Sequence, residues 1–92
     1  MDLQEVAVCV KNGETFLGIE LGSTRIKAVL VTQNCHTISS GSYAWENRLE
    51  NGIWTYDLQE AWKGIQVCYA QLAGEVKSQY HVPLQRIGAI GI

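Results

Sequence analysis

The sequence predicts an α/β domain, because three β-prone segments separated by short turns precede one long segment of helical period and a final apolar run. The β-prone segments are residues 16–21, 26–32 and 37–45. Three consecutive strands joined by tight turns are typical of an antiparallel meander. A crossover as long as the helical segment would place the last strand parallel to an earlier one. We therefore expect a three-strand meander, a long helix and a fourth, parallel strand.

The composition is that of one folded domain with a slightly acidic balance. Of the 92 residues, 47% are hydrophobic and 17% are charged. Nine acidic against seven basic residues leave no positive surplus for phosphates along a nucleic acid, so nucleic acid is not expected as a partner. No apolar run approaches the roughly 20 residues that span a bilayer, and the start lacks the features of a signal peptide. The three cysteines lack the spacing of metal ligands. We therefore expect a cytoplasmic protein with no membrane partner.

Residues 1–15 form an extension ahead of the first strand. Apolar residues recur at three- and four-residue spacing from Asp2 to Asn12, Asp2 can cap the start, and Gly13 can end a helix in the left-handed conformation. The spacing predicts a short amphipathic helix. The β-branched valines of the segment leave a strand as the alternative.

The long helix is expected over residues 58–79. Asp57 with Glu60 three residues later has the form of a capping box, and Val82-Pro83 ends the helix because proline has no amide hydrogen. One face carries an apolar stripe that includes Trp62, for which packing in the core is the expected role.

The segments before and after this helix differ in character. Residues 46–56 are predicted to be a polar loop with a turn at Asn51-Gly52. Residues 86–92 are small or branched and apolar, which predicts a buried strand of a sheet covered on both faces.

A Gly-Ser-Thr turn between the first two strands has the chemistry of a phosphate site. Gly22 permits close approach of the backbone, successive amides in a tight turn attract anions, and the hydroxyls of Ser23 and Thr24 add donors. Glu20 precedes the turn with a carboxylate suited to a magnesium ion or its bound waters, and Lys27 adds a positive charge. Neither a Walker-type loop nor a dinucleotide-binding glycine motif is present. The alternative interpretation of these residues is an ordinary hairpin tip.

The segment 16–31 resembles the first phosphate motif of the actin-like ATPase superfamily, and most of all that of FGGY carbohydrate kinases such as xylulokinase and ribulokinase. In that motif an apolar strand is followed by Asp, an apolar residue, Gly, two Ser or Thr residues and a Lys or Arg. Gly22-Ser23-Thr24 and Lys27 match these positions, and Glu20 stands where the family has Asp.

The resemblance continues along the chain to residue 92. Trp54 through Asp57 to Trp62 is similar to a Trp-Asp-Trp segment that opens the long helix of these kinases. Residues 86–92 resemble the strand that leads to their sugar-contacting loop. Residues 1–15 have no counterpart in the resemblance.

The resemblance implies a truncated ribonuclease H-like, actin-like ATPase domain, of which residues 16–92 are the first part. It implies ATP and Mg²⁺ as cofactors, with Gly22, Ser23, Thr24 and Lys27 near the β- and γ-phosphates and Glu20 directed to the metal. The implied reaction transfers the γ-phosphoryl group to a hydroxyl of a small-molecule sugar. The general base, the adenosine motifs and the main sugar contacts of the family come later than residue 92. No catalytic residue is therefore assigned, and these 92 residues alone are expected to be inactive as a kinase.

Two other functions fit the same motif. An activator-type ATPase of the superfamily uses ATP to drive a conformational change in a partner. The other is a non-catalytic actin-like interaction module, for which Glu20 in place of Asp is the only hint. A homo-oligomer paired through an open sheet edge is a further alternative for the assembly.

Overall fold

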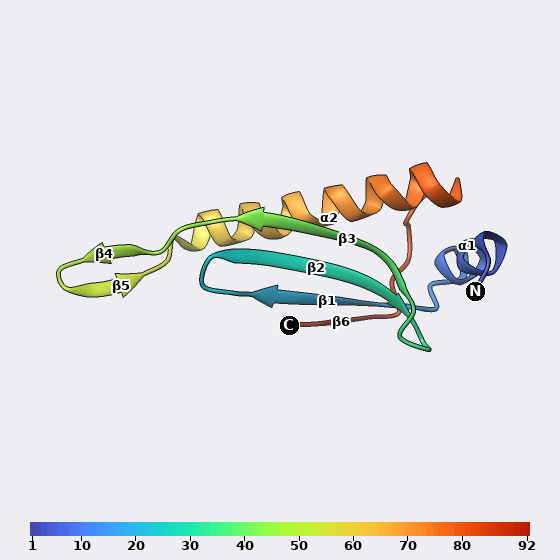
Figure 1. The fold of residues 1–92 in the computed structure, drawn as a ribbon, viewed down its shortest axis with the longest axis horizontal. Helices are drawn as coiled ribbons and strands as arrows, with labels where there is room; N and C mark the ends of the chain where they lie inside the picture. Colours follow the sequence, from blue (N-terminus) through green and yellow to red (C-terminus); the bar gives the residue numbers. More distant parts are fainter.

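The computed structural model describes the backbone of residues 1–92 and all side chains except those of Arg48 and Trp54. The molecule is elongated, with extents of 53 × 22 × 17 Å. Figure 1 shows a sheet that runs alongside one long helix. Strands and helices occur in the order α1 (Leu3–Asn12), β1 (Thr15–Leu21), β2 (Arg25–Thr32), β3 (Thr37–Ala44), β4 (Arg48–Glu50), β5 (Ile53–Thr55), α2 (Leu58–Tyr80) and β6 (Ala89–Gly91).

The main sheet has the predicted topology. Its strand order is β3-β2-β1-β6, with antiparallel pairing within β1 to β3 and parallel pairing of β6 with β1. The β1–β2 register places Thr15 opposite Thr32 and Leu21 opposite Ile26. The meander, the long helix and the fourth parallel strand are therefore confirmed as a small α/β domain with a mixed sheet.

The N-terminal segment is a helix, as predicted, and not a strand. The Asp2 carboxylate accepts a hydrogen bond from the Glu5 amide at 2.8 Å, and Gly13 ends the helix with a φ of 72°. Val6 and Val10 are buried in the same core as the sheet and α2. Helix α1 therefore closes one end of the core (Figure 1).

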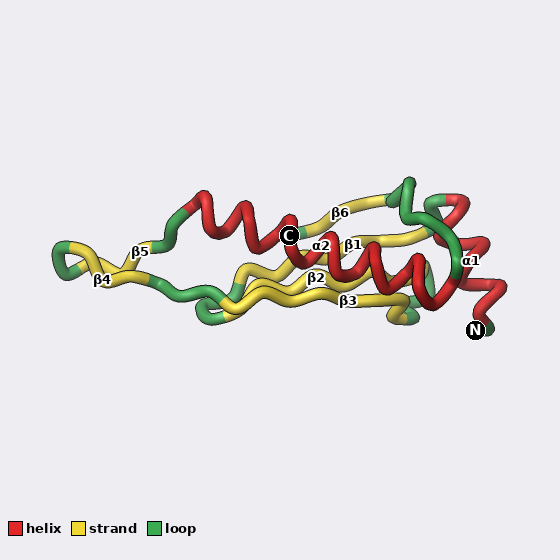
Figure 2. The backbone as a smooth tube through the Cα atoms, turned by 90° about the horizontal axis from the view of Figure 1, so that it is seen from above, coloured by secondary structure: helices red, strands yellow, loops and turns green.

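Helix α2 begins and ends where the sequence indicated. The Asp57 carboxylate caps it by accepting from the Gln59 amide at 2.9 Å. His81 ends it in the left-handed conformation, two residues before Pro83. Figure 2 shows that α2 runs along the sheet for most of its length. No helix among the described residues is both long and apolar enough to cross a membrane.

Helix α2 lies unusually close to the sheet at its middle. A Cβ atom on Gly41 of β3 would collide with the backbone of Cys68, and one on Gly64 of α2 would collide with Ile26 and Tyr43. Cys68 is fully buried there, and its thiol donates to the carbonyl of Ile26 at 3.4 Å. Burial raises the pKa of the Cys68 thiol, so the group stays protonated and acts as a small apolar side chain.

Trp62 does not pack in the core, and this prediction was wrong. Its side chain is 64% exposed, and Leu58 one turn earlier is also exposed. The buried residues of α2 begin only at Gly64, which faces the end of β2 and β3. Ala61, the residue before Trp62, packs against the core, so this turn of α2 already lies over the sheet and Trp62 falls outside the buried side of the helix.

The expected burial of the last strand was also wrong. All three residues of β6 are exposed, and Ile90 on this strand is 62% exposed. The reason is that β6 is an edge strand, while α2 packs over β2 and β3.

The segment predicted to be a polar loop contains a short hairpin instead. Strands β4 and β5 pair across the Asn51-Gly52 turn and project from one end of the molecule (Figure 1). The turn was predicted, and the two flanking three-residue strands were not.

The close approach of α2 to β3 predicts a large cost for a methyl group at position 41. We expect Gly41→Ala to lower the free energy of unfolding by about 2 kcal/mol or more, because the helix must move away from the sheet. Gly74→Ala is the control. Gly74 lies in α2 with no atom near an added Cβ, and the substitution should raise the free energy of unfolding by about 0.5–1 kcal/mol. Urea unfolding followed by circular dichroism measures both. Equal stability of the two variants would contradict the packing described.

Thr15 and Thr32 are a buried cross-strand pair, and replacing each with valine should change the free energy of unfolding in opposite directions. Among the described residues, the Thr15 hydroxyl has no hydrogen-bond partner, whereas that of Thr32 accepts from the His36 amide at 3.1 Å. Thr15→Val removes an unpaired buried hydroxyl and should raise the free energy of unfolding by about 1 kcal/mol. Thr32→Val leaves the His36 amide without this partner and should lower it by about 1 kcal/mol. Thermal unfolding of both variants checks the signs, and a loss of stability in Thr15→Val would contradict this assignment.

Candidate functional site

The predicted phosphate-binding residues lie at the turn that joins β1 and β2. The turn closes through a hydrogen bond from the Gly22 amide to the Arg25 carbonyl at 3.0 Å, with Ser23 and Thr24 exposed at its tip. A Cβ on Gly22 would lie 2.9 Å from the Arg25 oxygen, closer than real side chains come. Glycine is therefore required here by the close approach of two backbone segments.

Two aromatic residues hold the carbonyl groups of this turn. The Trp45 indole donates to the Gly22 carbonyl at 2.7 Å, and the Trp45 amide donates to the Thr24 carbonyl at 3.2 Å. The Tyr56 hydroxyl donates to the Ser23 carbonyl at 3.4 Å. The two rings stack with their centroids 4.6 Å apart and an angle of 25° between their planes. Three successive carbonyls are thus engaged on one side of the turn.

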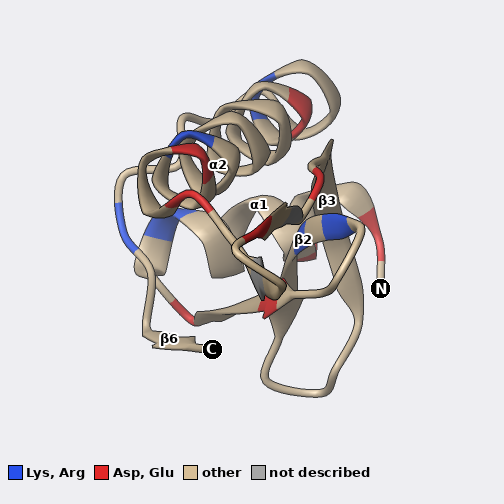
Figure 3. Ribbon diagram, turned by 90° about the vertical axis from the view of Figure 1, so that its left-hand side faces the viewer, with Lys and Arg blue, Asp and Glu red and all other residues tan. Residues whose placement is uncertain are grey.

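Glu20 and Lys27 are direct cross-strand partners next to the turn. Strand alternation places both on the face of the sheet opposite to that of Ile26 and Leu30, which are buried under α2. Figure 3, viewed along the molecule, shows that α2 lies on one side of the sheet. The two opposite charges are therefore neighbours on the open face.

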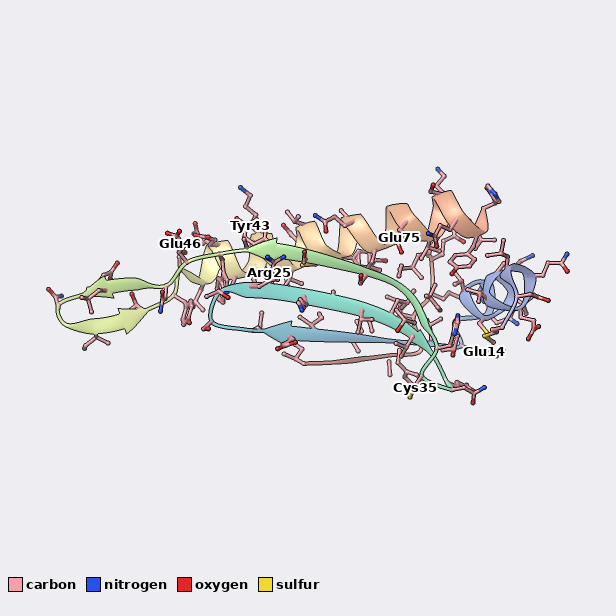
Figure 4. All side chains as sticks on the ribbon, viewed as in Figure 1. Glu14, Arg25, Cys35, Tyr43, Glu46 and Glu75 are labelled. Carbon is pink, nitrogen blue, oxygen red and sulfur yellow. The ribbon has the colours of Figure 1, made fainter. Side chains whose placement is uncertain are left out.

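The open face of the sheet carries a shallow hollow of about 900 Å³. Its polar lining comes from the three strands of the meander and from α2: Glu20 of β1, Arg25 and Lys27 of β2, Thr37, Ser40 and Ser42 of β3, and Gln71 of α2. The Arg25 guanidinium donates to the Ser42 hydroxyl at 3.2 Å. Figure 4 shows that Arg25 lies toward the β4–β5 end of the sheet and Cys35 toward the other end. The charged part of the hollow thus lies next to the turn.

The predicted residues do not all line this hollow. Glu20 and Lys27 do, while Gly22 and Ser23 form the turn beside it. Thr24 lines a separate pocket of about 530 Å³ together with Glu46 and Glu60. The second pocket carries two acidic side chains, which disfavour an anion, whereas the hollow carries Arg25 and Lys27 in addition to Glu20.

Several residues of the site were not selected from the sequence. Arg25 and Ser42 could have been found, because period-two alternation places Arg25 on the same face as Lys27 and pairs Ser42 with Lys27 across β2 and β3. Trp45 and Tyr56 flank the hairpin of residues 48–55, but no sequence pattern shows that they reach the β1–β2 turn.

The donor set is compatible with magnesium held mainly by water and phosphate. Within the described part of the chain, no three His, Cys, Asp or Glu side chains gather as a metal-binding cluster. Mg²⁺ commonly takes one or two carboxylates and fills its remaining positions with water and substrate phosphate oxygens. The single carboxylate of Glu20 fits that pattern, and the neighbouring Lys27 and Arg25 supply charge for phosphate.

The geometry of the turn predicts the behaviour of the Trp45 indole. In the native chain its N–H should exchange with solvent more slowly than that of Trp62, because it is hydrogen-bonded and its residue is only 7% exposed. Gly22→Ala should remove this protection and lower the free energy of unfolding by about 1–3 kcal/mol, since the added methyl meets the Arg25 carbonyl. Hydrogen exchange followed by nuclear magnetic resonance (NMR) measures the indole signals. Gly91→Ala, with open space around its added Cβ, is the control, and slow exchange retained in Gly22→Ala would overturn the described turn.

Comparison of the chain with protein-family models and with curated proteins found no match.

Proposed function

We propose that the chain is the first part of the actin-like ATPase domain of an FGGY-type sugar kinase. The observation that carries the proposal is the β1–turn–β2 unit, in which a Gly-Ser-Thr turn lies beside a cross-strand carboxylate and ammonium pair. The meander, long helix and parallel strand support a ribonuclease H-like domain, because they occur in the order that the resemblance implies.

In this proposal the turn and its neighbours bind the β- and γ-phosphates of ATP. The amides of Ser23 and Thr24 donate to phosphate oxygens, and the two hydroxyls add further donors. The Lys27 ammonium offsets the negative charge, and the Glu20 carboxylate orients Mg²⁺ through its bound waters. Gly22 lets the backbone come close to the ligand.

The proposed reaction is attack of a sugar hydroxyl on the γ-phosphorus of ATP. A new oxygen–phosphorus bond forms, the bond from the γ-phosphorus to the β–γ bridging oxygen breaks, and ADP leaves. The hydroxyl proton passes to a general base that lies outside these 92 residues, so the chain contributes binding and charge and no catalytic residue. The acceptor is a small-molecule sugar, and we place the enzyme in the cytoplasm.

A titration with a non-hydrolysable ATP analogue and Mg²⁺ tests the phosphate site in the chain as it stands. We expect amide shifts in the NMR spectrum of the ¹⁵N-labelled protein to concentrate at residues 22–27. Thr24→Val should weaken binding about five-fold or more, because a hydrogen bond to a charged group is lost, and should leave the fold unchanged. Lys27→Met should weaken it further by removing a charge.

The control for this titration is Lys77→Met, which also removes an exposed ammonium, from the last turn of α2. Its affinity should equal that of the native chain. Shifts confined to other residues, or the same affinity in Thr24→Val and Lys27→Met as in the native chain, would refute the site. The 92-residue chain should show no ATP-dependent sugar phosphorylation, and measurable phosphorylation would refute the assignment of the base to another part of the enzyme.

A further inference from the structure

Trp45 and Tyr56 occupy a particular position between the turn and the β4–β5 hairpin. Trp45 directly follows β3, and Tyr56 directly follows β5 and precedes the cap of α2. Their stacked rings therefore close the base of the hairpin. From this position both donate hydrogen bonds to carbonyls of the β1–β2 turn, 21 to 33 residues earlier in the chain.

Because the peptide group is planar, a hydrogen bond that fixes a carbonyl also fixes the direction of the amide of the next residue. In a trans peptide the C=O of one residue and the N–H of the next point in opposite directions. A fixed Gly22 carbonyl therefore fixes the Ser23 amide on the other side of the turn, and a fixed Ser23 carbonyl does the same for the Thr24 amide. Neither amide has a hydrogen-bond partner among the described residues.

We infer that Trp45 and Tyr56 are positioning residues for the anion site, an inference that rests on the proposed function. They hold the carbonyls of Gly22 and Ser23 away from the ligand and orient the amides of Ser23 and Thr24 toward the phosphate oxygens. Donors fixed before the ligand arrives bind more tightly than donors that must first be ordered. Loss of either side-chain donor therefore weakens phosphate binding without removing any group that touches phosphate.

The hydrogen bonds from Trp45 and Tyr56 differ in length and in exposure to water. The indole bond is short, at 2.7 Å, and Trp45 is 7% exposed, so water competes little for the Gly22 carbonyl. The tyrosine bond is 3.4 Å long and Tyr56 is 39% exposed. We expect the Trp45 indole to orient the turn more strongly than the Tyr56 hydroxyl.

The chain offers a closely matched set of variants for the test. Trp45→Phe removes the indole donor and keeps an aromatic ring, and Tyr56→Phe removes the hydroxyl and keeps the stacked ring. Tyr80→Phe is the control, because its hydroxyl donates to the Ile38 carbonyl at the same 3.4 Å, far from the turn. Trp62→Phe controls for the loss of an exposed indole.

The experiment measures the affinity of each folded variant for Mg²⁺ with tripolyphosphate, and separately for Mg²⁺ with the non-hydrolysable ATP analogue, by NMR titration. Trp45→Phe should weaken binding of both probes about ten-fold and Tyr56→Phe about three-fold, while the two controls change by less than two-fold. Trp45→Phe and Tyr56→Phe should also shift the Ser23 and Thr24 amide signals without ligand. Thermal unfolding is recorded for every variant, because a purely structural role would lower the melting temperature and leave the affinity of the folded protein unchanged.

The possible results separate the two claims. If the native chain binds both probes at the turn and Trp45→Phe and Tyr56→Phe bind equally well, the positioning role is refuted and the proposed function stands. If tripolyphosphate binds in a manner that depends on Trp45 and the ATP analogue does not bind, the positioning role stands and the nucleotide assignment fails. If the native chain binds neither probe, both claims are refuted. Should Trp45→Phe fail to fold, Tyr56→Phe decides between these outcomes.

Discussion

The close packing of α2 on β3 is the constraint on which the rest of the structure depends. Gly41 and Gly64 carry no side chains where the two elements meet, so the backbone of Cys68 lies directly against the sheet. This contact fixes which residues of α2 are buried and which strands the helix covers. The sheet is therefore covered on one side over β2 and β3, while β6 and the face that bears Glu20 and Lys27 stay open.

The position of α2 also determines the surroundings of the β1–β2 turn. The chain leaving β3 forms the β4–β5 hairpin before α2 starts, and the first turn of α2 lies near the β1–β2 turn, since Glu60 and Thr24 line one pocket (Figure 1). Trp45 and Tyr56 lie near the two ends of the segment that joins β3 to α2, and both contact the turn. This segment thus brings two hydrogen-bond donors to the carbonyls of residues 22 and 23. Structure and candidate site are linked through one stretch of chain.

Much of this architecture follows from local signals in the sequence. Asp2, Gly13 and Asp57 mark helix ends because capping is a local interaction, and strand positions follow from local β propensity and turn residues. The exposure of Trp62 and Ile90 does not follow, since helical period and apolar content do not reveal how wide the buried side of a helix is or how many layers cover a strand. Likewise, Gly22-Ser23-Thr24 and Lys27 are recognisable as a motif, whereas the contacts from Trp45 and Tyr56 depend on tertiary structure alone.

In the proposed function, the β1–β2 turn is a phosphate site, and two aromatic residues on the side opposite to the ligand orient its amides. A crystal structure of the chain with Mg²⁺ and a non-hydrolysable ATP analogue tests it most directly. We predict phosphate oxygens within hydrogen-bond distance of the Ser23 and Thr24 amides and of the Lys27 ammonium, with the Trp45 indole still bonded to the Gly22 carbonyl. A nucleotide bound elsewhere, or a turn whose carbonyls have rotated toward the ligand, would contradict the account.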